Sequence, residues 1–259
     1  MDYVKEHLEN VSIYPDSEYI KLKQAISSYS KADTDHIILG EGATGLISKF
    51  IQFVNPKHSM VMIPAYSEYK SELNKIEGNA IFSYSLKKEN CFQGDTSDLI
   101  KKTNEKQADI LILCNPNNPT GQFLKLKKLE EILKICEQKN TKLFVDEAFV
   151  EFVEDWENES IINSKENKEN LFVIRAFTKF FAIPGLRLGY GICFNNNLLK
   201  KMLEKKEPWS VNNIADLAGK TVLDDENYIQ KTKEWIKDQK KYMYENLNKI
   251  EGLRAYKTE

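Results

Sequence analysis

The sequence predicts an α/β fold with a mostly parallel, seven-stranded sheet and helices on both faces. Three observations lead to this prediction. Short runs rich in β-branched residues alternate along the chain with longer amphipathic stretches, which is typical of such sheets. Hydrophobic residues make up 41% of the 259 residues, which is enough for a sizeable core. Motifs rich in glycine, proline and polar residues follow the apolar runs, where ligands bind in parallel sheets.

Seven apolar runs are expected to form the strands, because each is short and bounded by turn-forming residues. They are His36–Leu39, Ser59–Ile63, Ala80–Tyr84, Asp109–Cys114, Thr141–Val145, Leu171–Ala176 and Arg187–Phe194. Amphipathic stretches between them are expected to form helices, among them Leu46–Val54, Ser67–Ile76 and Lys125–Lys139.

The end of the chain has a different pattern. Apolar residues recur at helical spacing from about residue 224 to Ile250, which indicates one long helix lying across a domain or, alternatively, a coiled coil. Gly252 is expected to end this helix, and Leu253–Tyr256 to begin a strand. We therefore expect residues 1–250 to form one large domain that ends in the long helix. Residues 251–259 are expected to begin a smaller domain that the chain truncates.

Composition excludes several classes of protein. The 37 basic and 39 acidic residues give a net charge of −2, so neither nucleic acid nor a membrane is an expected partner. The four cysteines and three histidines are scattered, and their spacing predicts neither a metal site nor a CxxC redox pair. No apolar run approaches the length of a membrane span, and the N-terminus lacks the apolar stretch of a signal peptide. We expect a cytoplasmic protein with reduced thiols.

The first motif that can carry chemistry is Gly40-Glu41-Gly42-Ala43-Thr44-Gly45, between a predicted strand and a predicted helix. It matches the GxGxxG fingerprint of dinucleotide sites, but the next strand ends in Ile63-Pro64 without the acid that such sites require. The backbone amides at the start of the helix remain suited to a phosphate group. By itself the motif fits an ordinary strand–helix turn equally well.

Two further motifs follow predicted strands. Asn115-Pro116-Asn117-Asn118-Pro119-Thr120-Gly121 is a loop stiffened by two prolines, which can aim an asparagine amide into a crevice. Val145-Asp146-Glu147-Ala148-Phe149 places two acids at the end of a buried strand, where a carboxylate is costly unless it meets a cation. A protonated pyridine nitrogen is such a cation. The alternatives are a surface loop or a metal ligand, and no histidine or second acidic cluster supports the metal.

The fourth motif runs from Arg175 to Tyr190 and is the most specific. It places Lys179 among aromatic residues directly after a strand. A desolvated lysine near another cation has a lowered pKa, which favours the free amine that a Schiff base requires. Arg187 follows eight residues later and can bind a phosphate group through two hydrogen bonds.

Together these stretches resemble the fold-type I enzymes that depend on pyridoxal 5′-phosphate (PLP), in the class I and II aminotransferase family. The resemblance runs from about Tyr14 to the end of the chain. It is greatest for threonine-phosphate decarboxylases of the cobalamin pathway and next for histidinol-phosphate aminotransferases. The stretches that carry it are Asp146–Phe149, Thr178–Gly185 and Pro208–Asn212. It implies a PLP-binding large domain, a phosphorylated amino acid or amine as substrate, and a homodimer.

The resemblance also implies a role for each motif residue. Lys179 would hold PLP covalently and later transfer protons. Asp146 would pair with the pyridine nitrogen, Asn118 would hydrogen-bond the phenolic oxygen of the ring, and Tyr66 would stack on the ring. The residues implied to bind the phosphate are Gly42, Ala43, Thr44, Thr178, Arg187 and, from the partner subunit, Tyr14.

The sequence departs from the family pattern at several positions. Phe149 stands where these aminotransferases usually have a tyrosine, so Asn118 would act alone on the ring oxygen. Ala176 replaces a common hydroxyl residue, and Glu41 replaces a common asparagine. The arm that covers the substrate and most of the small domain, which supplies the carboxylate-binding arginine, are expected to be missing from this chain.

Three readings of function follow. The first is a decarboxylase and the second an aminotransferase, and both use the same large domain. A PLP-binding domain with little activity is the third, because the groups that grip the substrate carboxylate are expected to lie outside this chain. A PLP-sensing transcription regulator is disfavoured, since the chain ahead of Tyr14 is too short for a DNA-binding domain.

Overall fold

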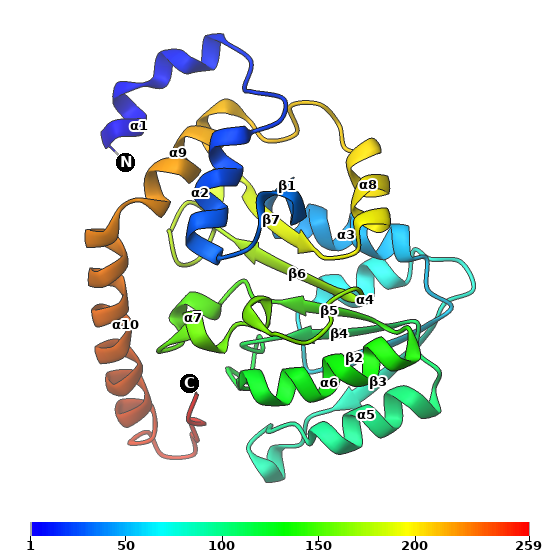
Figure 1. Cartoon of the computed structure of the whole chain (residues 1–259). Helices are drawn as coiled ribbons and strands as arrows, with labels where there is room; N and C mark the ends of the chain where they lie inside the picture. Colours follow the sequence, from blue (N-terminus) through cyan, green and yellow to red (C-terminus); the bar gives the residue numbers. More distant parts are fainter. Residues whose placement is uncertain (1, 259) are drawn as a thin grey trace.

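A seven-stranded sheet organises the computed structural model, which describes residues 2–258 (Figure 1). Its strands are β1 (Ile37–Glu41), β2 (His58–Ile63), β3 (Ala80–Ser85), β4 (Ile110–Cys114), β5 (Lys142–Asp146), β6 (Leu171–Ala176) and β7 (Leu188–Cys193). They lie in the order β1-β7-β6-β5-β4-β2-β3. Strand β7 is antiparallel to β1 and β6, and all other pairs are parallel. The predicted fold class is confirmed, and each predicted strand is present within a few residues.

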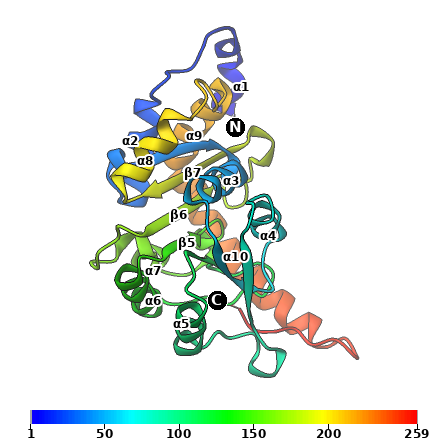
Figure 2. The same ribbon diagram turned by 90° about the vertical axis from the view of Figure 1, so that its right-hand side faces the viewer.

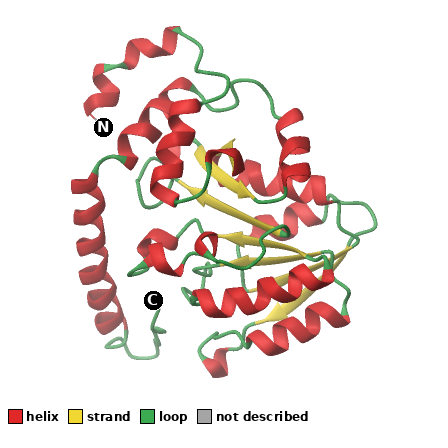
Figure 3. Cartoon of the chain, viewed as in Figure 1, coloured by secondary structure: helices red, strands yellow, loops and turns green. Residues whose placement is uncertain are grey.

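Helices cover both faces of this sheet (Figures 2 and 3). On one face, α3 (Gly42–Val54), α4 (Ser67–Leu73) and α8 (Asn196–Glu204) share a core with residues such as Phe144 and Phe172. On the other face lie α2 (Ile20–Ser30), α5 (Thr96–Glu105), α6 (Leu126–Lys139) and α9 (Asn213–Leu223). Because both faces are covered, β4, β6 and β7 are buried at every position, and their sequences are nearly continuous apolar runs.

Shorter elements connect these layers. The helix α1 (Asp2–Glu6) precedes α2, and α7 (Trp156–Glu159) lies between β5 and β6. The 3-10 turns are η1 (Leu8–Ser12), η2 (Thr34–His36), η3 (Lys88–Asn90), η4 (Val150–Phe152), η5 (Ile161–Asn163) and η6 (Pro184–Leu186). Within residues 2–258, no helix is both long enough and apolar enough to cross a membrane.

The long predicted helix is α10 (Glu226–Leu247), which runs down one side of the sheet (Figure 1). Several contacts tie it to the sheet layers: the Tyr228 hydroxyl donates to the Phe180 carbonyl (2.9 Å), and Lys233 pairs with Glu157 (2.8 Å). The predicted strand at Leu253–Tyr256 is wrong. This segment turns back instead, and the Tyr256 ring packs edge-on against Phe92 at 5.2 Å between ring centroids.

Candidate active site

A cavity of about 190 Å³ lies beyond the carboxyl ends of the parallel strands. Its lining includes a residue that follows β2 (Tyr66), one that follows β4 (Asn118), the last residue of β5 (Asp146) and one that follows β6 (Lys179). Eight of the ten residues proposed from the sequence line it: Ala43, Thr44, Tyr66, Asn118, Asp146, Thr178, Lys179 and Arg187. Residues up to 144 positions apart in the sequence therefore meet because parallel strands end at the same edge.

One end of the cavity is suited to an anion. The first turn of α3 contributes Ala43 and Thr44 to the wall, and amides in the first turn of a helix have no partner within the helix. The helix dipole adds positive potential at the same place. Glu41 replaces a common asparagine in this motif and would place a carboxylate near the phosphate. Its side chain is exposed and makes no hydrogen bond that caps the helix.

Two glycines make this end of the cavity possible. Gly42 has a φ of +75°, and a Cβ atom there would lie 2.6 Å from Nη2 of Arg187, so the guanidinium group lies directly over its backbone. Gly42 thus does not line the cavity but seats a residue that does. A Cβ atom at Gly189 would lie 2.6 Å from the amide nitrogen of Ala43, so β7 can approach the start of α3 only with glycine at this position.

Two cationic side chains stand beside these amides. Arg187 has a left-handed backbone (φ 55°), and its Nη1 donates to the Pro184 carbonyl at 3.2 Å. The Lys179 amino group lies 5.9 Å from the centroid of the Phe149 ring. We expected a desolvated lysine from its aromatic neighbours, and this was wrong: the lysine is exposed. Phe177, Phe180 and Phe181 turn into the core below instead.

The other end of the cavity holds a buried carboxylate. Asp146 is only 5% exposed, and it accepts hydrogen bonds from the Tyr69 hydroxyl (2.6 Å) and the Ala148 amide (2.9 Å). Burial raises the pKa of Asp146 to about 6, because the charged form is desolvated. In residues 2–258 no ion pair neutralises it. Because Asp146 lies on the cavity wall, a cation of a bound ligand can pair with its carboxylate.

The neighbouring acid has a different environment. Glu147 points to the other side of the sheet, where its carboxylate accepts hydrogen bonds from Nε (3.0 Å) and Nη2 (2.8 Å) of Arg175. The Ser160 hydroxyl and the Ile161 amide also donate to it. The two acids at the end of β5 therefore do different things: Glu147 completes a buried ion pair, and Asp146 faces the cavity.

The loop after β4 is held by the asparagines that flank Asn118. Asn115 both donates to and accepts from the backbone of Leu124 (2.9 and 2.7 Å), and Asn117 donates to the Pro64 carbonyl (3.0 Å). In the described part of the chain, the Asn118 side chain makes no hydrogen bond of this kind and lines the cavity. The stiff loop predicted from the prolines thus presents one amide to the site.

Sequence reasoning missed Tyr69 and Cys114, which also line the cavity. Tyr69 lies three residues after Tyr66, at the spacing that brings side chains to one face of a helix, and this spacing was the available signal. The Tyr66 and Tyr69 rings meet edge-on with centroids 5.7 Å apart. Cys114 is buried, and burial raises the pKa of its thiol to about 12, so it is no nucleophile.

Tyr14 is the predicted site residue that lies elsewhere. Its ring is 78% exposed and contacts the Trp209 ring at 4.7 Å between centroids, away from the cavity of its own chain. The structure of one chain therefore leaves its proposed role in a partner's site as a prediction.

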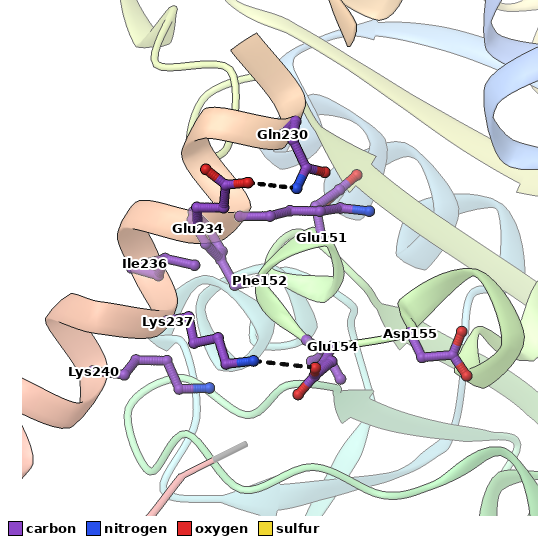
Figure 4. A pocket seen from close by; sticks show the side chains of 11 residues that line it. Glu151, Phe152, Glu154, Asp155, Gln230, Glu234, Ile236, Lys237 and Lys240 are labelled. Carbon is purple, nitrogen blue, oxygen red and sulfur yellow. Dashed lines mark hydrogen bonds and ion pairs between the residues drawn. The ribbon is translucent and has the colours of Figure 1, made fainter. Parts of the chain in front are cut away.

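A second cavity, of about 290 Å³, lies between α10 and the segment Glu151–Asp155 (Figure 4). It is the larger of the two, and some of its polar groups pair with each other. Lys237 pairs with Glu154 at 3.5 Å, and Gln230 donates to Glu234 at 2.8 Å. None of the ten residues proposed from the sequence lines it. The smaller cavity at the strand ends is therefore the candidate site.

The charges of the candidate site fit a particular kind of ligand. Helix amides, Thr178 and Arg187 offer donors to an anion at one end, and Asp146 offers a buried carboxylate to a cation at the other. Lys179 and the exposed Tyr66 line the same cavity. Among the described residues, no group of three histidine, cysteine, aspartate or glutamate side chains could hold a metal ion. An aromatic phosphate with a protonated ring nitrogen matches both ends.

Comparison with known proteins agrees with this description. The sequence pattern of class I and II aminotransferases matches residues 5–259. A Caldanaerobacter subterraneus protein provisionally named as a threonine-phosphate decarboxylase is 37% identical over 99% of this chain and 70% of its own. The Salmonella typhimurium threonine-phosphate decarboxylase is 32% identical over 97% of this chain and 68% of its own. The crystal structure of histidinol-phosphate aminotransferase from Clostridium acetobutylicum superposes with a TM-score of 0.86 and 35% identity, covering 96% of this chain and 72% of that one.

Proposed function

Since this chain belongs to the family of class I and II aminotransferases, we propose that its cavity binds PLP and that the protein decarboxylates L-threonine-O-3-phosphate. The observation that carries the cofactor assignment is the position of Asp146, a buried carboxylate that faces the cavity opposite a set of anion-binding groups. The decarboxylase assignment is supported by two relatives that carry this name and match nearly the whole chain.

The lining residues divide the binding of PLP among them. Arg187, Thr178 and the first-turn amides of α3 bind the phosphate group, with Gly42 seating the arginine. Asp146 holds a proton on the pyridine nitrogen, because a carboxylate next to that nitrogen favours its charged form. Asn118 donates to the phenolic oxygen, and Phe149 supplies no hydroxyl for the same task. Tyr66 packs against the face of the ring.

Lys179 is the proposed catalytic residue. It lines the same cavity, where its amine can attach to the cofactor and later move a proton to or from the reacting carbon. PLP, when bound, supplies an electron sink for the substrate bond that stands at right angles to its ring. Which bond that is depends on the groups that grip the substrate. Their positioning separates loss of carbon dioxide from loss of a proton.

A histidinol-phosphate aminotransferase is the second candidate, favoured by the 35% identity to the Clostridium acetobutylicum structure. The two candidates differ in their need for a keto acid. We expect carbon dioxide release from L-threonine-O-3-phosphate without 2-oxoglutarate. Activity only with histidinol phosphate and 2-oxoglutarate would favour the aminotransferase. Absence of turnover with either substrate, in a protein that binds PLP, would support a PLP-binding domain with little activity.

We also propose a cytoplasmic homodimer in which Tyr14 of each subunit reaches the phosphate site of the other. Its 78% exposure leaves the ring free to do so. Sedimentation of the PLP-loaded protein at micromolar concentration should give a dimer. The substitution Tyr14→Phe should weaken PLP binding without changing the mass of the dimer. A monomer with full PLP affinity would contradict this role for Tyr14 and leave that of Lys179 untouched.

A further inference from the structure

Tyr69 connects two groups of the candidate site. It lies on α4 and is only 1% exposed, although it carries a hydroxyl group. That hydroxyl donates to Oδ2 of Asp146 at 2.6 Å, and its ring meets the Tyr66 ring edge-on at 5.7 Å. The same ring also meets Phe144 of β5 edge-on, with centroids 6.2 Å apart. One buried side chain thus contacts the group proposed for the ring nitrogen and the group proposed for the ring face.

Few groups near Asp146 can stabilise its negative charge. The titratable groups near it are Tyr69 from α4, Cys114 from β4 and Glu147, which follows it in sequence but points to the other side of the sheet, and the cations Lys179 and Arg187 line the same cavity. Of these side chains, in the described part of the chain, only the Tyr69 hydroxyl hydrogen-bonds the carboxylate. A hydrogen bond donated to a carboxylate stabilises its charged form, whereas burial opposes it.

The Tyr69 hydroxyl is suited to remain a hydrogen-bond donor. Burial, and after it the neighbouring Asp146, raise the pKa of Tyr69 well above its usual value, so the hydroxyl keeps its proton throughout the neutral range. Because the ring packs against Tyr66 and Phe144, the hydroxyl also has a fixed direction. The donor is therefore oriented before any ligand arrives.

We propose that Tyr69 is a positioning residue that keeps Asp146 charged and directed at the cofactor's ring nitrogen while it sets the angle of the Tyr66 ring. This inference rests on the proposed PLP site and adds a residue that acts through Asp146 and Tyr66. Without the hydroxyl, the buried carboxylate binds its proton more tightly. A pyridinium nitrogen must then compete with that proton, so PLP binding weakens most below the raised pKa and recovers at higher pH, where the carboxylate is charged with or without the hydroxyl.

The test compares Tyr69→Phe with Tyr84→Phe in the full chain. Tyr84 is the matched control, because its hydroxyl is also buried and hydrogen-bonded, to the Asp95 carbonyl at 3.1 Å, but lies outside the site. In protein freed of PLP, the loss of stability caused by Tyr69→Phe should grow as pH rises from 4 to 8. The loss caused by Tyr84→Phe should stay constant. At pH 6 we expect PLP affinity to fall about tenfold in Tyr69→Phe, because the lost hydrogen bond is to a charged group, and less than about twofold in Tyr84→Phe.

A second variant, Tyr69→3-fluorotyrosine, guards against a phenylalanine variant that does not fold. It keeps the shape and makes the hydroxyl a stronger donor, so stability at pH 8 and PLP affinity should both rise. Parallel pH profiles for the two phenylalanine variants, or no change with 3-fluorotyrosine, would overturn the inference. Failure of the wild-type protein to bind PLP would overturn the proposed function instead, and the profiles without PLP would still decide whether Tyr69 controls Asp146.

Discussion

Asp146 and Glu147 are adjacent in sequence and both buried, yet they lie in opposite environments. Glu147 meets Arg175, Ser160 and a backbone amide, so its charge is compensated within the chain. Within residues 2–258, Asp146 receives two side-chain hydrogen bonds and no ion pair. At Glu147 the fold is stabilised by its own residues, and at Asp146 it depends on a ligand. Glu147 is part of the structure itself, whereas Asp146 becomes favourable when a positive group occupies the cavity.

The largest effect is expected on the Glu147 side. The substitution Glu147→Gln leaves the Arg175 guanidinium buried without its counter-ion. It should lower the free energy of unfolding by about 3–5 kcal/mol. Urea unfolding measures it. Glu157→Gln is the control, because it breaks the exposed pair with Lys233 (2.8 Å) and should cost no more than about 1 kcal/mol. Similar costs for both variants would show that the buried pair is not special.

In protein freed of PLP, Asp146→Asn is expected to raise the free energy of unfolding, whereas Glu147→Gln lowers it. The folded pKa of Asp146, about 6, lies above its ordinary value of 3.8. The folded state therefore binds the proton more tightly, and stability is lost as pH rises from about 4 to about 6. Asp146→Asn should remove this loss and stabilise the protein at pH 8 by about 1–3 kcal/mol, while PLP affinity falls. A destabilised variant at pH 8 would contradict the comparison.

A smaller effect is expected at the anion end. Gly42→Ala places a Cβ atom 2.6 Å from the Arg187 guanidinium and strains a residue with a φ of +75°. PLP affinity should fall about tenfold, equivalent to about 1.4 kcal/mol. Gly78→Ala has the same strain (φ +74°) but open space around the new Cβ atom, so it should lose stability without losing PLP affinity. Equal PLP affinity in the two variants would mean that Arg187 does not bind the phosphate.

The smallest effect is expected in the larger cavity beside α10. Lys237 and Glu154 are largely exposed, so their ion pair at 3.5 Å contributes little. Lys237→Ala should change neither the unfolding midpoint nor PLP affinity beyond experimental error. A loss of PLP affinity in this variant, measured by titration, would show that the larger cavity takes part in binding.

Much of the fold could be predicted because local signals and the final structure agree. Strands such as β4 and β6 are continuous apolar runs, and the motifs that follow them meet at one edge of the sheet. Leu253–Tyr256 was mistaken for a strand because of its apolar residues. Leu253 is in fact exposed, and the Tyr256 ring packs against Phe92 rather than in a sheet.

The candidate site, too, could be predicted only in part. Lys179, Asp146 and Asn118 could be proposed from the strands that they follow, but their environments could not. The aromatic residues beside Lys179 suggested a desolvated amine, whereas the turn sends those rings into the core and leaves the lysine exposed. Tyr69 was missed because its hydroxyl meets Asp146 across 77 residues of sequence, a contact that only the packing of α4 on β5 creates.

Lys179 is proposed to hold PLP in the cavity at the strand ends. The most direct measurement is to mix the purified protein with PLP, reduce it with borohydride and locate the modified lysine by peptide mass spectrometry. We expect a visible absorbance band that reduction removes, and a pyridoxyl group on Lys179. Modification of another lysine, with Lys179 unmodified, would contradict the assignment of the site.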